Sequence, residues 1–154
     1  MIDDKIRYLN QDAADVALKN PIAEATVRKA REYRLERTRQ VLRDNDIAAV
    51  LLYDPCNIRY ATDTSNMQLW TMHNPSRYAL IFADGPALLF DYHNCAHLHD
   101  EKRLPNGQHT VDEIRPAIAW AYFAAGERAP EQAVRWGADI ASLMKQYGGG
   151  NKRL

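Results

Sequence analysis

The stretch from residue 91 to residue 99 carries the densest set of side chains that could bind a metal ion or transfer a proton. Potential ligands occupy every second position: Asp91, His93, Cys95, His97 and His99. In an extended strand all five would share one face, whereas in a helix His93 and His97 would lie one turn apart. A tetrahedral zinc ion needs three or four converging ligands, which one flat strand cannot supply and a helix supplies only in part. We therefore expect histidines that are solvated or lie at a helix end and titrate near neutral pH. The alternative is a zinc site on Asp91, His93, His97 and His99.

The two cysteines, Cys56 and Cys95, lie far apart and form no CxxC pair. Free thiols of this kind are more often core residues than nucleophiles, so we expect both to be buried, with a nucleophilic role as the lesser alternative. The sequence also lacks the GxxxxGK(S/T), GxGxxG, GxSxG and HExxH motifs. The common catalytic signatures are therefore missing from the sequence.

The segment from residue 54 to residue 76 is a second candidate site. It is expected to be a long connection between a buried strand and a hairpin, and such connections inside a compact domain are usually functional. Its candidate side chains are Asn66, Met67, Trp70, His73 and Asn74. The alternative is that Trp70 and Met67 cover an edge of the sheet as part of the core.

The elements that must position these residues follow from the pattern of apolar side chains. Apolar residues at helical spacing predict helices over about 24–45 and 130–147, the second ended by Gly148, Gly149 and Gly150. A continuous apolar run predicts a buried strand at 47–53, and two runs around Asp84-Gly85 predict an antiparallel hairpin of 77–83 with 86–92. Residues 109–123 are apolar and β-prone around Pro116. Helices and strands linked in this way predict an α/β fold with three layers, α/β/α, around a mixed sheet.

Composition limits the classes of partner. The chain has 154 residues, of which 46% are hydrophobic, and its 20 basic and 20 acidic residues cancel. A neutral protein is not expected to bind nucleic acid or an anionic membrane, so the charged faces of the first helix are expected to be solvated. Neither a membrane span nor a secretory signal is recognisable, which favours a soluble, cytoplasmic protein. Residues 1–23 are expected to form an N-terminal arm, and residues 24–154 a single domain.

The sequence NIRYAT at 57–62, after a predicted buried strand and before a predicted hairpin, resembles the first domain of the creatinase/prolidase superfamily. The stretches TSNMQLW at 64–70 and HNP at 73–75 are similar, more narrowly, to its dimethylsulfoniopropionate-cleaving lyase branch. The resemblance covers about residues 24–154 and is strongest between 50 and 92. It implies a ribonuclease H-like, three-layer domain with a mixed sheet.

The resemblance also implies that catalysis belongs to a different domain. In this superfamily two metal ions are held by two Asp, one His and two Glu of a following pita-bread domain, which these 154 residues do not include. The chain alone is therefore expected to be inactive and to hold no cofactor, and its expected partners are a second copy and its own catalytic domain. The loop of one subunit is expected to cover the active site of the other. Trp70 is the first choice for the shielding side chain, with Asn66, Met67, His73 and Asn74 beside it. An indole face attracts a sulfonium cation and packs equally well on proline.

Two questions stay open at this stage. The sequence departs from the lyase pattern after Asp91, so the parent reaction is either C–S cleavage of dimethylsulfoniopropionate or hydrolysis of an Xaa-Pro bond. The alternative of a different class is a freestanding metal- or ligand-binding module that uses residues 91–99. A reading frame that continues past Leu154 into spaced Asp, Asp, His, Glu and Glu residues would favour the enzyme domain, and a stop codon would favour the module.

Overall fold

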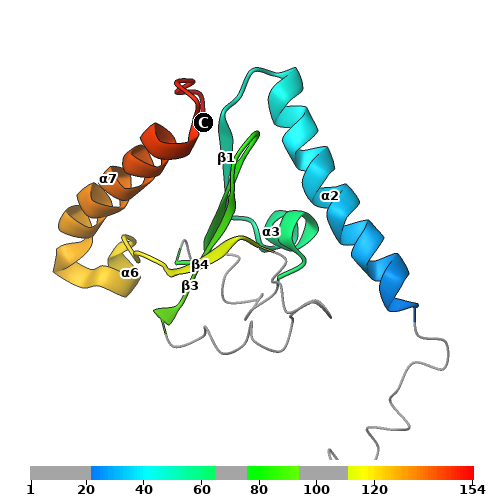
Figure 1. Cartoon of the computed structure of the whole chain (residues 1–154). Helices are drawn as coiled ribbons and strands as arrows, with labels where there is room; N and C mark the ends of the chain where they lie inside the picture. The colour runs from blue at the N-terminus through cyan, green and yellow to red at the C-terminus, as the bar shows by residue number, and fades with distance from the viewer. Residues whose placement is uncertain (1–21, 65–75, 94–110) are drawn as a thin grey trace, which may run out of the picture.

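The structure of the chain, a computed structural model, describes residues 22–64, 76–93 and 111–154 (Figure 1). In chain order its elements are helix α2 (Glu24–Asp44), strand β1 (Ala49–Leu52), helix α3 (Pro55–Thr62), strands β2 (Tyr78–Phe82), β3 (Ala87–Asp91) and β4 (Glu113–Pro116), helix α6 (Tyr122–Ala125), a 3-10 turn (Gly126–Arg128) and helix α7 (Ala129–Tyr147). Both long helices and all three strands that the sequence predicts are therefore confirmed. Each strand is one or two residues shorter at its ends than its apolar run.

The four strands form one mixed sheet in the order β1-β2-β3-β4. The predicted hairpin is confirmed, because β2 pairs antiparallel with β3 and places Tyr78 opposite Phe90. Strand β1 pairs antiparallel with the other side of β2, whereas β4 runs parallel to β3. The sheet is mixed because one strand pair is joined by a tight turn and another by a longer crossover.

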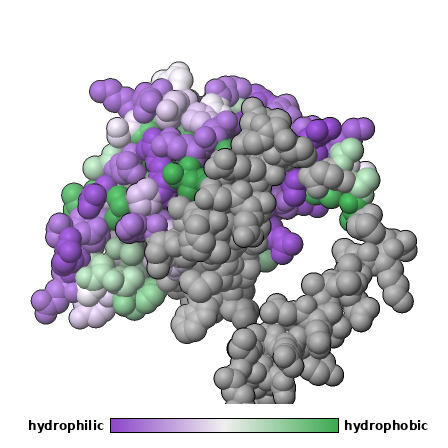
Figure 2. Space-filling view, turned by 60° about the horizontal axis from the view of Figure 1, so that its bottom comes forward, coloured by the Kyte–Doolittle hydropathy of each residue, from purple (hydrophilic) through white to green (hydrophobic). Residues whose placement is uncertain are grey.

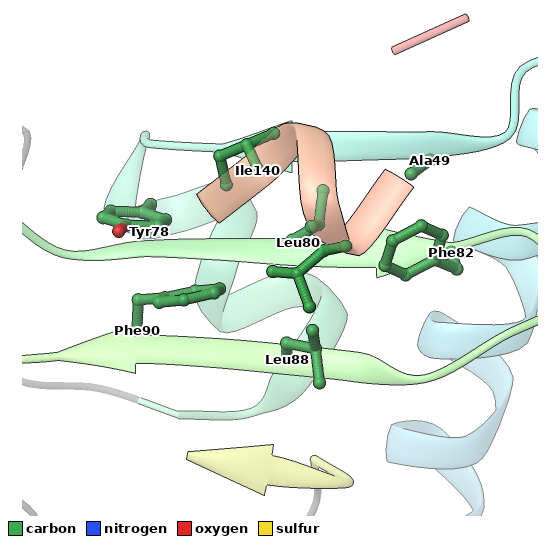
Figure 3. Close-up of a cluster of buried hydrophobic side chains, with 8 residues drawn as sticks. Ala49, Tyr78, Leu80, Phe82, Leu88, Phe90 and Ile140 are labelled. Carbon is green, nitrogen blue, oxygen red and sulfur yellow. The ribbon is translucent and has the colours of Figure 1, made fainter. Parts of the chain in front are cut away.

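Helices cover both faces of this sheet, which gives the predicted three layers. Alternate side chains of β2 point to opposite faces: Tyr78, Leu80 and Phe82 pack with Ile140 of α7 (Figure 3), and Ala79 packs with Ile58 of α3. Figure 1 shows α7 on one side of the strands and α2 with α3 on the other. Every residue of β2 and β3 is buried, and this explains why their sequences are continuous apolar runs.

Helix α2 is fastened to the hairpin by two arginines. Arg39 donates from Nη2 to the Gly85 carbonyl at 2.8 Å, and Arg43 donates from Nη1 to the Ala83 carbonyl at 2.9 Å. A Cβ at position 85 would lie 2.9 Å from Cβ of Phe82, so the turn needs its glycine. The expectation that the charged faces of α2 are simply solvated is therefore wrong for these two side chains.

Helix α3 corrects two expectations. Residues 55–62 are helical, although residues 54–76 were expected to form one long connection. Its buried face consists of Pro55, Ile58, Ala61 and Thr62, spaced as on one side of a helix. Cys56 lies on another face and is exposed, so the prediction that it is buried is wrong.

The residues after α7 close the domain against the start of β1. The Ala48 N–H donates to the Arg153 carbonyl at 3.0 Å. Asn151 donates from Nδ2 to the Asp46 carbonyl at 3.0 Å, and Arg153 Nη1 lies 3.3 Å from Oδ2 of the same aspartate. The C-terminal residues are thereby joined to the turn between α2 and β1.

Two further expectations concern the N-terminal arm and membrane-spanning helices. Most of the predicted N-terminal arm, residues 1–21, lies outside the described residues. Among the helices in residues 22–64, 76–93 and 111–154, none combines the length and the apolar composition that crossing a membrane requires.

Candidate functional site

Most of the predicted site residues lie outside the described part of the chain: Asn66, Met67, Trp70, His73, Asn74, Cys95, His97 and His99. Their roles therefore stay predictions. The structure does describe the residues on either side of the segment that carries Trp70. Thr64 precedes this segment and Ser76 follows it, and both residues are buried.

A buried ion pair lies where the chain returns from this segment. Arg77 donates from Nε to Oδ2 of Asp91 at 2.9 Å, and each side chain is only 1% exposed. The other carboxylate oxygen, Oδ1, accepts the backbone N–H of Tyr92 at 2.8 Å. A buried carboxylate of this kind needs a charge partner and further donors, and both are present here.

The same guanidinium also binds the residue where the chain leaves α3. Arg77 donates from Nη2 to Oγ1 of Thr64 at 2.9 Å, and Oγ1 of Thr64 lies 2.7 Å from Oγ1 of Thr62. Thr62 donates in turn to the Ile58 carbonyl at 2.7 Å. Because arginine only donates and a carbonyl only accepts, each hydroxyl must donate onward toward Ile58, so the direction of every proton in this row is fixed.

Asp63 lies between the two threonines, and its side chain binds α2 instead of Arg77. Its backbone has a φ of 52° and ends α3 in the left-handed conformation. Its carboxylate accepts Nε of Arg31 on α2 at 2.6 Å. Successive side chains at 62, 63 and 64 therefore hold this turn both to the sheet and to α2.

We call Thr62, Thr64, Arg77 and Asp91 the Arg77 anchor. It joins the start and the end of the segment 65–75, and it also holds the end of β3, shortly before the second undescribed segment. Arg77 is not among the site residues predicted from the sequence, although a signal for it was present. In the hairpin register Tyr78 lies opposite Phe90, so Arg77 and Asp91 are opposite charges one position further on.

The alternative zinc site contains one residue that already has a charge partner, because Asp91 belongs to the Arg77 anchor. His93 follows it and is exposed. No three His, Cys, Asp or Glu side chains lie together as potential metal ligands within the described residues. We therefore assign no step of metal chemistry to these residues.

An aromatic cluster packs the other face of the sheet at the same end of the hairpin. The rings of Tyr78 and Phe90 stack with centroids 4.5 Å apart, and Tyr53 lies 5.2 Å from Tyr78. Trp120 contacts Tyr53 edge-on and also lies against Trp136 of α7. Burial raises the pKa of Tyr78, although its hydroxyl accepts the Ile118 N–H at 3.3 Å. This end of the hairpin is therefore held on both faces.

The described surface contains several hollows. Hydrophilic side chains predominate on the face in Figure 2, and hydrophobic residues lie there in small separate groups. A cavity of about 650 Å³ runs along α7 and the residues after it, lined by Trp136, Ile140, Met144, Lys145, Asn151 and Leu154 among others. A smaller hollow of about 370 Å³ lies between the residues after β4 and the start of α7. Neither hollow contains a residue of the Arg77 anchor.

Comparison with known proteins supplies the remaining findings. Residues 34–154 match the model of the creatinase/prolidase N-terminal domain family. The chain is 39% identical over 128 residues to a dimethylsulfoniopropionate lyase of Roseovarius nubinhibens, covering 83% of this chain and 27% of that protein. It is 37% identical over 107 residues to a dimethylsulfoniopropionate lyase of Roseobacter denitrificans, covering 70% of this chain and 23% of that protein. The chain thus spans about a quarter of the length of these relatives.

Proposed function

The chain belongs to the creatinase/prolidase N-terminal domain family, and on that premise we propose that it is the non-catalytic first domain of a metal-dependent enzyme. The metal ions and the bond-breaking chemistry belong, in this proposal, to a following catalytic domain. The likeness to proteins of about four times the matched length supports this division, because the matched part is only about a quarter of each relative. In this proposal the chain contributes to dimerisation and covers the active site of the partner subunit, and it provides no reacting group.

The proposed reaction is cleavage of dimethylsulfoniopropionate. The observation that carries it is the 39% identity to a dimethylsulfoniopropionate lyase over 83% of this chain. In the test, the full-length protein is loaded with metal and given dimethylsulfoniopropionate or an Xaa-Pro dipeptide. Release of dimethyl sulfide without dipeptide hydrolysis is the expected result, and hydrolysis of the dipeptide alone would favour the peptidase reading.

The proposed task of the segment 65–75 is to cover the active site of the partner subunit, with Trp70 against the substrate. The indole is a suitable cover, because its face attracts a sulfonium cation and its area excludes water. Trp70→Ala in the full-length protein should lower turnover at least about tenfold, which corresponds to roughly 1.4 kcal/mol of transition-state stabilisation. Metal content and the unfolding midpoint should stay unchanged.

Trp120→Phe provides the matched control, since Trp120 packs inside the described domain. This variant should lose some stability and keep its turnover per folded molecule. If Trp70→Ala instead lowers the melting temperature by several degrees and leaves turnover unchanged, Trp70 is a core residue and the proposed cover is wrong.

The proposed cover also requires a homodimer. Large apolar side chains that are more than half exposed could contribute to such an interface, and they include Ile22, Tyr33, Val41, Tyr122, Phe123 and Val134. Mixing a Trp70→Ala chain with a chain that lacks one catalytic-domain metal ligand tests the arrangement. A mixed dimer should regain activity if Trp70 acts on the partner's site, and a mixture as inactive as its components would show that it does not.

A further inference from the structure

The hollow of about 370 Å³ between the residues after β4 and the start of α7 has two walls of different chemistry. One wall is uncharged and consists of residues 116–119 with Ala124 and Ala125. The other wall presents Arg128, Gln132 and Arg135, and their spacing of four and three residues places them on one face of the helix. One wall is therefore apolar, and the other is rich in hydrogen-bond donors.

The same sheet holds both walls in place. The Ala117 N–H donates to the Asp91 carbonyl at 2.8 Å, and the Ile118 N–H donates to the Tyr78 hydroxyl at 3.3 Å. Helix α7 packs on that sheet through the buried Ile140. The hollow is thus formed without a ligand, and a preformed site loses less free energy on binding than one that must first be ordered.

The donors of the α7 wall are available to a ligand. Within the described part of the chain, the side chains of Gln132 and Arg135 have no hydrogen-bond or ion-pair partner. Arg128 lies 3.5 Å from Glu131, but the two side chains are 69% and 68% exposed, and an ion pair so exposed contributes little. None of the described residues that line the hollow is acidic. The hollow therefore favours an anion.

The chemistry of the two walls indicates which anion fits. A guanidinium presents parallel N–H groups at the spacing of the two oxygens of a carboxylate. The uncharged wall suits a short hydrocarbon chain, which an inorganic phosphate ion lacks. Small-molecule sites have volumes of about 300–1,000 Å³, so a hollow near the lower limit accepts only a small ligand.

We propose that this hollow is a binding site for a small organic acid. Arg128 and Arg135 bind the carboxylate, the amide of Gln132 donates to it, and the hydrocarbon part packs against residues 117–119. The inference goes beyond the proposed function and holds whether or not the parent protein cleaves dimethylsulfoniopropionate.

The test counts the propionate molecules bound per subunit of the full-length, metal-loaded protein by equilibrium dialysis. The main variant is Arg128→Met with Arg135→Met, and the control is Arg37→Met, which replaces an exposed arginine on α2 across the sheet (Figure 1). The wild type and Arg37→Met should bind one more propionate per subunit than the main variant does. This difference is independent of any carboxylate that the metal ions bind. Equal numbers in all three proteins would overturn the inference.

A second variant fills the hollow without changing its charge. Ala124 lines the hollow and is exposed, so Ala124→Leu adds bulk there and should leave the unfolding midpoint close to that of the wild type. This variant should also bind one propionate fewer per subunit. If it binds as many as the wild type, the arginines hold the anion outside the hollow, and the inference is wrong.

Two further probes test the class of ligand. Propionamide has nearly the shape of propionate but no charge, and inorganic phosphate has charge but no hydrocarbon chain. Each should displace propionate from the arginine-dependent site at least tenfold less well than unlabelled propionate does. Displacement by either probe as effective as that by propionate would overturn the assignment to a carboxylate with an apolar chain.

Discussion

Tyr78 is a residue whose ionisation the fold opposes. The side chain is fully buried, and burial raises its pKa above the ordinary value near 10. Above about pH 10 the Tyr78 phenol of the unfolded chain loses a proton that the folded chain keeps, so the free energy of unfolding must fall as pH rises. We predict that Tyr78→Phe weakens this fall by up to about 1.4 kcal/mol per pH unit above pH 10. Urea unfolding at several pH values between about 9 and 11.5 measures the slope.

Tyr33→Phe is the control for this prediction, because it removes the hydroxyl of an exposed tyrosine on α2. It should keep the wild-type slope. An equal slope in the wild type and in Tyr78→Phe would show that burial of this phenol does not determine the alkaline stability.

At the same scale, part of the Arg77 anchor is predictable from the sequence. The Asp84-Gly85 turn fixes the hairpin register, and this register places Arg77 opposite Asp91. The roles of Thr62 and Thr64 were not predictable in this way. A threonine hydroxyl can bind its own helix, a turn or water, and only the tertiary structure selects among them.

At the scale of elements, one glycine within helix α7 and one directly after it have opposite expected effects on stability when replaced by alanine. A Cβ at Gly137 would meet nothing within 4 Å, whereas a Cβ at Gly148 would lie 2.5 Å from the Met144 carbonyl oxygen. Gly137→Ala should therefore raise the free energy of unfolding by about 0.5–1 kcal/mol, because alanine loses less backbone entropy in a helix. Gly148→Ala should lower it by about 1–3 kcal/mol through overpacking. Urea unfolding measures the change in the free energy of unfolding for each variant. Changes of the same sign in both variants would contradict the packing at the end of α7.

Helix α3 begins with a capping bond that can be tested in the same way. Oδ1 of Asp54 accepts the Asn57 N–H at 2.8 Å, and Pro55 occupies the first turn. Asp54→Ala should cost about 1 kcal/mol, and Asp54→Asn should retain most of the stability because the amide oxygen can still accept. A variant Asp54→Ala with wild-type stability in urea would show that this cap does not stabilise α3.

The same cap explains why the sequence pattern predicts a connection where α3 lies. Asp54-Pro55 follows a buried apolar run and is typical of the end of a strand, although an acidic N-cap followed by proline is equally the signature of a helix start. Other elements were predicted well because their signals were redundant. The strands of the hairpin combine apolar runs with a turn, and α7 combines helical periodicity with proline at its start.

At the scale of the whole molecule, several ion pairs of the described residues join side chains that are distant in sequence. Asp91 binds Arg77, and no cluster of three metal-binding side chains occurs within the described ranges. We therefore predict that a chelator leaves the melting temperature of the 154-residue chain unchanged, because a structural metal would add several kcal/mol to folding. A fall of several degrees in a thermal melt with chelator would instead favour the zinc site at 91–99.

The sequence predicts where the candidate site lies, but not how it would act. The length of the connection before the hairpin and residues such as Trp70 predict a functional segment there, and this stays a prediction because residues 65–75 lie outside the described chain. The proposed contact with a partner subunit would depend on surfaces that one chain does not contain, so no pattern within the chain predicts it.

The contacts of Asp46 and Ala48 with residues 151–153 affect the order in which the domain can form during synthesis. Asn151 and Asp46 are 105 residues apart, so the ribosome must complete nearly the whole domain before β1 acquires these bonds. The β2–β3 hairpin closes over a short loop and can form while translation continues. Until α7 emerges, the nascent chain exposes the apolar face of the sheet that this helix will cover, and exposed apolar surface makes such a chain prone to aggregate.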